Sequence, residues 1–510
     1  MRNMRENRKQ TTKKNRLGGG YFNKLLTKDV KEINKVFLSL FCTGIILIAI
    51  FIGVSITKTS YALFSDTITG EKTIEVEVDT CNLYVPNKPI LDTNMIPVYY
   101  DEINEVWKKA DSTNQDRNYK WYDYCEKKWA NSVTVTSSSR STYLNAALGT
   151  EIDMEDILTM QVWVPRYKYK VWNYNADGTV TSEPQEIEIV FEEGKASTGD
   201  IVCTDNIQGE GGDGTSEVCK LGNDTCTDNL CNGSYYTHPA FTFGSEELTG
   251  FWVGKFEVTG TIDNITTKPS EVSLRNQRVG DFSTNIMSMK DSGNIYGFTS
   301  NVDTHMIKNV EWGSIAYLSH SKYGTCSNGN CSEIGINNNS SYITGCGSEA
   351  GSSSSTSCNA YNTSLGKLAS TTGNIYGVYD MNGGANDYVM GNVVSPDGEQ
   401  MMSGYSATNN SGYTGIIYAG GNYTSYTGTY SYPEEKYYDK YSFGNSSSVL
   451  IGSKLGDSIK EVKSDSLLWY NGNYYMAHNL YPWFARGMFT QGNGGGGRGP
   501  SYSTHLIIIS

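Results

Sequence analysis

The chain lacks the short motifs by which most enzyme classes are recognised. No Walker A, G-x-S-x-G or H-E-x-x-H pattern occurs in its 510 residues. Two stretches match G-x-G-x-x-G, Gly209–Gly214 and Gly494–Gly499, but neither follows a strand and opens a helix. Without that context their backbone N–H groups cannot be aimed at a pyrophosphate, so both are predicted to be loops. Motifs alone therefore reveal no active site.

Histidine and charge are also scarce. None of the five histidines is followed by another at the spacing of a metal motif, so we interpret them as solvent-facing or capping residues: His238, His305, His320, His478 and His505. A metal triad would have to be assembled from distant segments. Charged residues make up only 19% of the chain and the net charge is −13, which argues against non-specific nucleic-acid binding.

Glycine and aromatic residues take the place of charge. The chain has 54 glycines and 37 tyrosines, and aromatic residues make up 12% of it. This composition disfavours a coiled coil, a helical bundle or a disordered acidic chain. It favours short strands, tight turns and tyrosine-lined surfaces.

The N-terminal region resembles an export signal. Residues 1–35 are strongly basic, and residues 36–56 contain no charged side chain. A run of that length can cross a bilayer, and its basic flank is expected to stay in the cytoplasm. We therefore predict a cytoplasmic tail at 1–35 and a transmembrane or signal segment at 36–56. Through residues 36–56 the protein would contact the membrane unless this segment is cleaved off. Ser60–Ala62 has the form that a signal peptidase cuts, and the next residues resemble the start of mature camelysin-like proteins. Cleavage is expected after Ala62.

The cysteines agree with export. Ten of the 11 lie beyond residue 56 and fall into neighbouring couples, which predicts disulfides and an extracytoplasmic, cell-surface or secreted protein. The nearest-neighbour pairs are Cys81–Cys125, Cys203–Cys219, Cys226–Cys231, Cys326–Cys331 and Cys346–Cys358. Sequence alone leaves the connectivity open, and the Cys-x4-Cys couples could instead be halves of a zinc site.

Changes in composition divide the remainder of the chain. Residues 57–90 are predicted to be a processed linker with a first strand, and 91–200 an all-β accessory domain with strands that break at Pro165. Residues 201–232 are rich in Gly, Asp, Asn, Thr and Cys, and are expected to form a disulfide-stapled loop. Residues 233–510 form the last domain.

Four ordered segments of that last domain resemble the formylglycine-generating-enzyme (sulfatase-modifying factor) family. Phe251–Thr259 (FWVGKFEVT) is similar to the family's opening strand, and Asn309–Tyr317 (NVEWGSIAY) to a helix entry. Gly373–Gly383 (GNIYGVYDMNG) and Pro482–Gly487 (PWFARG) are similar to two later signatures. The resemblance implies a C-type-lectin-like fold. The expected fold class is thus α+β and β-rich: a C-type-lectin-like C-terminal domain, an all-β accessory region before it, and one N-terminal transmembrane helix.

Departures from the family pattern argue against its oxidase activity. The resemblance implies a copper-binding cysteine pair near the C-terminus, yet residues 359–510 contain no cysteine. Without a thiolate there is no soft ligand for copper. We therefore expect no enzyme, no catalytic residue, no bound metal and no cofactor. Domains of this family often hold structural calcium, so the resemblance leaves open whether this chain binds a structural calcium ion.

A cluster near the C-terminus is the candidate ligand-binding face. It combines rigid aromatic and adaptable amide side chains, the composition of antibody-like binding loops. Its members are Tyr470, Asn471, Asn473, Tyr474, Tyr475, His478, Asn479 and Tyr481. The same fold also serves bacterial and phage receptors that diversify this end. The alternative is that such clusters occur throughout a chain of this composition, and residues 410–445 are indeed similar.

Three functions remain open at this stage. The leading hypothesis is a bacterial surface or secreted binding protein, adhesin-like or receptor-like, for a surface glycan or protein ligand. The alternative is a structural subunit of the cell envelope or biofilm matrix. A formylglycine-generating-type oxidase comes last, because its catalytic cysteines are absent.

Overall fold

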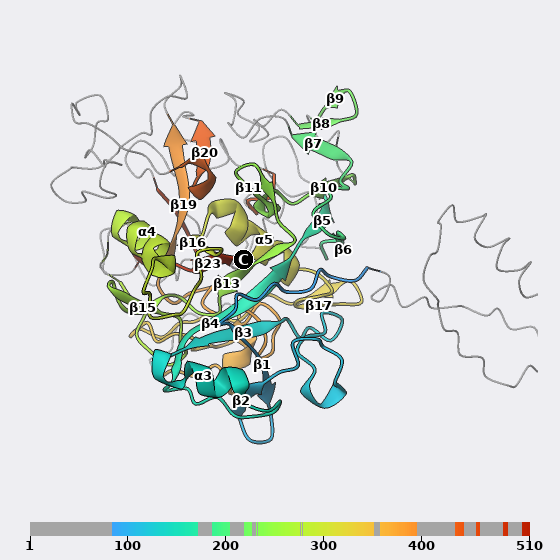
Figure 1. The fold of residues 1–510 in the computed structure, drawn as a ribbon. Helices are drawn as coiled ribbons and strands as arrows, with labels where there is room; N and C mark the ends of the chain where they lie inside the picture. The colour runs from blue at the N-terminus through green and yellow to red at the C-terminus, as the bar shows by residue number, and fades with distance from the viewer. Residues whose placement is uncertain are drawn as a thin grey trace, which may run out of the picture. The chain divides into compact units, whose positions relative to one another are not determined.

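The computed structural model, drawn in Figure 1, describes most of the chain from residue 84 onward. The described residues are 84–171, 186–203, 219–226, 231, 233–275, 277, 279–350, 357–394, 434–442, 455–458, 483–487 and 502–510.

A seven-stranded antiparallel sheet forms the centre of the fold. Its strand order is β16-β23-β13-β4-β3-β1-β2. The bounds are β1 Ile96–Asp101, β2 Val106–Lys109, β3 Asn131–Val135, β4 Ile157–Pro165, β13 Gly250–Gly254, β16 Asp303–Met306 and β23 Leu506–Ile509. The central strands β13 and β4 are buried at nearly every position. Their runs of Val, Ile, Leu and Trp are typical of strands that are covered on both faces.

The central sheet joins regions that the sequence places in different domains. Strand β4 pairs with β13 along five residue pairs, with Trp163 opposite Trp252. The rings of these two tryptophans lie 5.2 Å apart. The expected all-β accessory region and the C-terminal region therefore share one sheet. The first of them also contains a helix, α3 (Ser137–Asn145), so the all-β expectation for 91–200 is wrong.

Smaller sheets surround this centre. A six-stranded sheet has the order β6-β5-β10-β7-β8-β9, and β19 pairs with β20, β21 and β22 in a second group. Their bounds are β5 Tyr167–Lys170, β6 Ile189–Phe191, β7 Ile201–Cys203, β8 Cys219–Leu221, β9 Asp224–Thr225, β10 Tyr235–Thr237, β19 Asn386–Val394, β20 Asp439–Ser442, β21 Trp483–Arg486 and β22 Tyr502–Ser503. Three hairpins complete the strands: β11 Thr242–Phe243 with β12 Glu246–Glu247, β14 Thr259–Thr261 with β15 Asn264–Thr266, and β17 Cys326–Ser327 with β18 Asn330–Cys331.

The described helices are short. Besides α3, they are α4 (Val279–Met287) and α5 (Asn309–Ser319). The 3-10 helices are η2 Arg117–Tyr119, η3 Pro239–Phe241, η4 Ser288–Lys290, η5 Gly366–Ala369 and η7 Glu435–Tyr437. Helix α5 is buried on all sides and begins at the expected residue.

The expectation of an N-terminal transmembrane helix is not supported and is corrected here. Among the residues that the structure describes, no helix is long and apolar enough to cross a membrane. The longest α-helix within the described ranges, α5, has 11 residues, which span about 17 Å, whereas a hydrocarbon core is ~30 Å thick. The segment 36–56, on which the expectation was based, lies outside the described residues. What the structure supports is a β-rich fold with few helices.

Disulfides link close neighbours in the sequence. Four of the five predicted pairs are confirmed: Cys203–Cys219, Cys226–Cys231, Cys326–Cys331 and Cys346–Cys358. Cys125 is also disulfide-bonded, and its expected partner Cys81 lies outside the described residues. Disulfides of this number are typical of an oxidising, extracytoplasmic environment.

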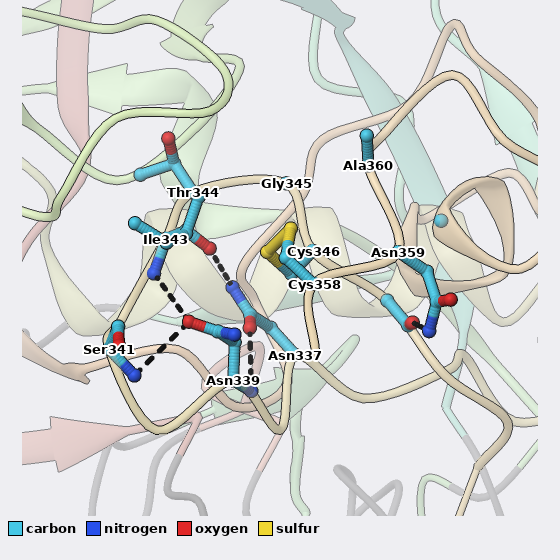
Figure 2. The surroundings of a disulfide bond; sticks show 12 residues. Asn337, Asn339, Ser341, Ile343, Thr344, Gly345, Cys346, Cys358, Asn359 and Ala360 are labelled. Carbon is cyan, nitrogen blue, oxygen red and sulfur yellow. Dashed lines mark hydrogen bonds between the residues drawn. A yellow bond between two sulfur atoms is a disulfide. The ribbon is translucent and has the colours of Figure 1, made fainter. Parts of the chain in front are cut away.

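The Cys346–Cys358 bridge lies beside a loop that is held by asparagine side chains (Figure 2). Asn339 accepts hydrogen bonds through Oδ1 from the backbone N–H groups of Ser341 (3.1 Å) and Ile343 (3.3 Å). Asn337 donates from Nδ2 to the Ile343 carbonyl at 2.8 Å. Because both asparagines are buried, these bonds replace the backbone ladder that an irregular loop lacks.

Candidate functional site

All eight residues of the expected binding face lie outside the described residues. They are Tyr470, Asn471, Asn473, Tyr474, Tyr475, His478, Asn479 and Tyr481. Both G-x-G-x-x-G stretches also lie wholly outside the described residues. A candidate site within the described residues must therefore be found from the geometry.

The four described histidines are buried rather than solvent-facing. His238, His305, His320 and His505 each expose at most 1% of their surface. His238 does cap a helix, since its Nδ1 accepts from the N–H of Ala240 at 3.2 Å at the start of η3. Burial lowers its pKa to about 3, so its imidazole is neutral at physiological pH. His305 differs from the others because it stacks on Phe243, which lines a cavity.

The cavity has a volume of about 500 Å³. It lies between the β11–β12 hairpin, the start of β16, the end of β23 and the 3-10 helix η7. The lining residues are Phe243, Gly244, Ser245, Glu246, Asn301, Asp303, Glu434, Glu435, Lys436, Ile509 and Ser510. Its size is within the range of small-ligand sites, and most of its lining is polar.

A carboxylate–imidazole–carboxylate array includes Asp303 and stacks on Phe243, two lining residues that we call the floor of the cavity. His305 Nδ1 is 3.1 Å from Asp303 Oδ1, and His305 Nε2 is 3.1 Å from Glu311 Oε1. The ring of Phe243 stacks on the imidazole with centroids 4.9 Å apart. Tyr437 donates its hydroxyl to Asp303 Oδ2 at 2.8 Å. The array is thus held from three different segments of the chain.

The charges of the array fix its protonation. Burial alone would lower the pKa of His305, but the charge of Glu311 and hydrogen bonds to both carboxylates leave that pKa above its ordinary value. The pKa of Asp303 is lowered, although burial opposes this, because His305 and Lys290 stabilise its anion. The pKa of Glu311 is lowered in the same way by Lys308 and His305, again against burial. The imidazole is therefore favoured in its charged form.

Local sequence explains why these groups meet. Asp303 and His305 are two residues apart on β16, so their side chains share one face of the strand. Glu311 is the third residue of α5, where its carboxylate accepts from the N–H of Lys308 at 2.8 Å and caps the helix. Phe243 precedes Gly244, whose φ of 64° suits the tight turn between β11 and β12.

The rim of the cavity is charged but largely neutralised. Four carboxylates and one ammonium group belong to its lining. Glu246 pairs with Lys195 at 3.1 Å, and Glu434 pairs with Lys436 at 3.3 Å. Lys290 lies 2.7 Å from Asp303. The cavity therefore offers directional hydrogen-bond donors and acceptors rather than a strong field of one sign.

The signature segments noted in the sequence meet elsewhere, in a buried polar network. Asp387 of β19 is opposite Arg486 of β21, and its carboxylate lies 3.0 Å from His505 Nδ1. The Arg486 guanidinium lies 4.0 Å above the ring of Trp312 and donates to Asn309 Oδ1 at 3.1 Å. All of these side chains are buried, so this network is a core element rather than a ligand site.

One further group has metal-binding chemistry. His320, Cys326 and Cys331 place one ligand atom each within 4.8 Å of one another. In this structure the two cysteines are joined in a disulfide.

Sequence reasoning missed the cavity because its parts are far apart along the chain. The only local signal is the Asp303-x-His305 spacing on a short strand. Nothing in the sequence connects it with Phe243, about 60 residues earlier, or with Tyr437, more than 130 residues later. In comparisons with known proteins, no family model and no curated protein matches the chain.

Proposed function

We propose that the protein is an extracytoplasmic binding protein whose cavity takes a neutral glycan. The observation that carries this proposal is the composition of the cavity: neutralised carboxylates, Lys436, Ser245 and Asn301 around a floor that includes Phe243. Hydroxyl groups of a sugar both donate and accept hydrogen bonds, so they suit a lining of mixed donors and acceptors. Ser510 also belongs to the lining, and its buried hydroxyl has no hydrogen-bond partner among the described residues.

The array at the floor favours binding over catalysis. A general acid or base must exchange its proton with a substrate. Both ring nitrogens of His305 are already engaged by Asp303 and Glu311, and its side chain is 1% exposed. The array therefore acts as a rigid support for Phe243 and Asp303. A floor of this kind keeps the cavity preorganised, which reduces the entropy cost of binding.

The resemblance to the formylglycine-generating-enzyme family remains part of the proposal. Its support is spatial: the Tyr379 N–H donates to the Lys255 carbonyl and the Gly383 N–H to the Gly487 carbonyl, both at 2.8 Å, so three of the segments that carry the resemblance contact one another. In this proposal a scaffold of that family has kept its buried core and has lost the chemistry of its enzymes.

The test of the function is a binding screen. The labelled exported protein is applied to glycan and bacterial- or host-surface arrays, with and without EDTA. We expect binding to a defined set of glycans that survives EDTA, because the cavity supplies its own polar contacts. Binding that EDTA abolishes would instead indicate a calcium-dependent site. Binding to proteins alone, or to no surface, would contradict the proposal.

Export is tested separately, at the N-terminus. We propose that the protein is secreted after cleavage between Ala62 and Leu63. The Ser60–Ala62 segment supplies the small residues that a signal peptidase needs. Mass spectrometry of the exported protein is expected to show Leu63 as the first residue. An exported chain that still begins at Met1 would show that no cleavage occurs.

A further inference from the structure

We propose that the β17–β18 hairpin is a redox-gated zinc site, formed by His320, Cys326 and Cys331 when its disulfide is reduced. The three ligand atoms already lie within 4.8 Å of one another. Two thiolates and one imidazole form a typical zinc donor set, with a fourth position left for water or another ligand. In the oxidised protein the same sulfur atoms are bonded to each other, so the site is closed.

The hairpin keeps the two sulfur atoms together without the disulfide. Cys326 and Cys331 are direct cross-strand partners, with Cα atoms 4.0 Å apart. The two residues of the turn, Asn328 and Gly329, have φ of 52° and 75°. These values fit the type I′ turn that Asn-Gly strongly favours in two-residue hairpins. The turn therefore holds the thiols adjacent after reduction.

Neighbouring contacts anchor the hairpin and the histidine to the rest of the fold. Lys127 Nζ donates to the Cys326 carbonyl at 2.8 Å, and Glu186 Oε2 accepts from the Gly329 N–H at 3.1 Å. The His320 carbonyl accepts from the Ile187 N–H at 2.9 Å. None of these bonds involves sulfur, so none is lost on reduction.

The state of each ligand also suits zinc. Neutral imidazole and thiolate are the ligand forms that bind zinc. Two thiolates balance the charge of Zn²⁺, which a buried position requires. Cys326 and His320 are buried, whereas Ser327–Asn330 are exposed and Cys331 is half-buried. A reductant can therefore reach the disulfide from the tip of the hairpin.

The chemistry balances with an external dithiol as the reductant. Thiol–disulfide exchange transfers two electrons and two protons to the Cys326–Cys331 bond, which breaks, while the dithiol becomes a disulfide. Zn²⁺ then displaces the two thiol protons as two Zn–S bonds form. Exchange with an external disulfide restores the bridge and releases the metal, while that disulfide takes up the two electrons and becomes a dithiol.

The test uses Co²⁺ as a visible probe for the zinc position. The exported protein is reduced without oxygen and titrated with Co²⁺, then with Zn²⁺. We expect one equivalent of Co²⁺ to produce thiolate-to-metal absorption, which Zn²⁺ abolishes. The non-reduced protein is expected to give none. The Cys326→Ser/Cys331→Ser variant should lose this absorption completely after reduction.

A matched control is available within the chain. Cys226 and Cys231 have the same Cys-x4-Cys spacing and form the same kind of bridge, but they belong to no metal-ligand group among the described residues. The Cys226→Ser/Cys231→Ser variant should therefore bind Co²⁺ like the wild type, and His320→Gln should weaken binding while both thiols remain. Equal absorption in the Cys326→Ser/Cys331→Ser variant would overturn the proposal. So would a reduced protein that loses its near-UV circular dichroism and does not regain it with zinc.

Discussion

Replacing Arg166 by methionine is expected to lower the free energy of unfolding by about 3–5 kcal/mol, the usual cost of breaking a buried ion pair. Arg166 and Glu192 are fully buried, and Arg166 Nε lies 3.0 Å from Glu192 Oε2. The guanidinium also donates to the carbonyls of Phe241 (3.2 Å) and Leu248 (3.1 Å), on either side of the β11–β12 hairpin. Without it, a carboxylate and two carbonyls remain buried and lose these bonds. Urea unfolding measures the effect.

A second variant separates the charge from the packing. Glu192 Oε1 accepts from the Thr198 N–H and from the Thr237 hydroxyl at 2.8 Å. Glutamine can keep these acceptor roles without a charge. The double variant Arg166→Met/Glu192→Gln should therefore be more stable than Arg166→Met alone. If the two are equally stable, the uncompensated charge is not the cause of the loss.

The exposed pair Lys170–Glu188 provides the matched control. Its atoms are 3.2 Å apart, but the side chains are 45% and 55% exposed. Exposed pairs contribute about 0–1 kcal/mol, because water and salt screen them. Lys170→Met should accordingly change the stability by no more than that amount.

Replacing Asp380 by asparagine is expected to make the protein more stable relative to the wild type as the pH rises from acid to neutral. Asp380 is buried, and burial raises its pKa to about 6, against the opposing hydrogen bonds from Asn337 and Gly345 and the charge of His505. Asparagine keeps an Oδ1 acceptor for Asn337 Nδ2 (2.7 Å) and the Gly345 N–H (2.9 Å). It also tolerates the left-handed backbone of this position, with its φ of 63°.

The direction follows from proton binding. Between the ordinary pKa of an aspartate and the raised value of about 6, the folded protein binds more protons than the unfolded chain. Stability therefore falls as the pH rises through this window, by up to about 1.4 kcal/mol per pH unit. Asp380→Asn removes this loss, so the difference between variant and wild type should grow by roughly 3 kcal/mol from pH 3.5 to pH 7. A difference that stays constant over this range would show that the carboxyl group ionises normally in the fold.

Local features of the fold are predictable from the sequence. Pro165 ends β4 where expected, α5 begins at Asn309, and four cysteine couples pair with their neighbours. Each of these depends on residues that are close together in the chain. A proline cannot donate a ladder hydrogen bond, and a short loop favours closure between near cysteines.

Long-range pairing is not predictable in this way. The pairing of β4 with β13 joins segments about 90 residues apart, and the mostly apolar sequence of each strand does not specify its partner. Helix α3 was missed because its nine residues, rich in serine, have no apolar face. The cavity was missed for the same reason as the sheet: Phe243, His305 and Tyr437 meet only after the strands have paired.

The central claim, a ligand-binding cavity at the β11–β12 hairpin, is tested most directly by blocking the cavity. Asn301 is an exposed lining residue, so Asn301→Trp should fill the entrance without disturbing the core. Ser137→Trp adds the same side chain at an exposed position on α3, which does not belong to the cavity lining. Titration with a glycan that binds the wild type should show an affinity reduced by about 100-fold for Asn301→Trp and unchanged for Ser137→Trp. Equal affinity in both variants would contradict the account and place the ligand elsewhere on the protein.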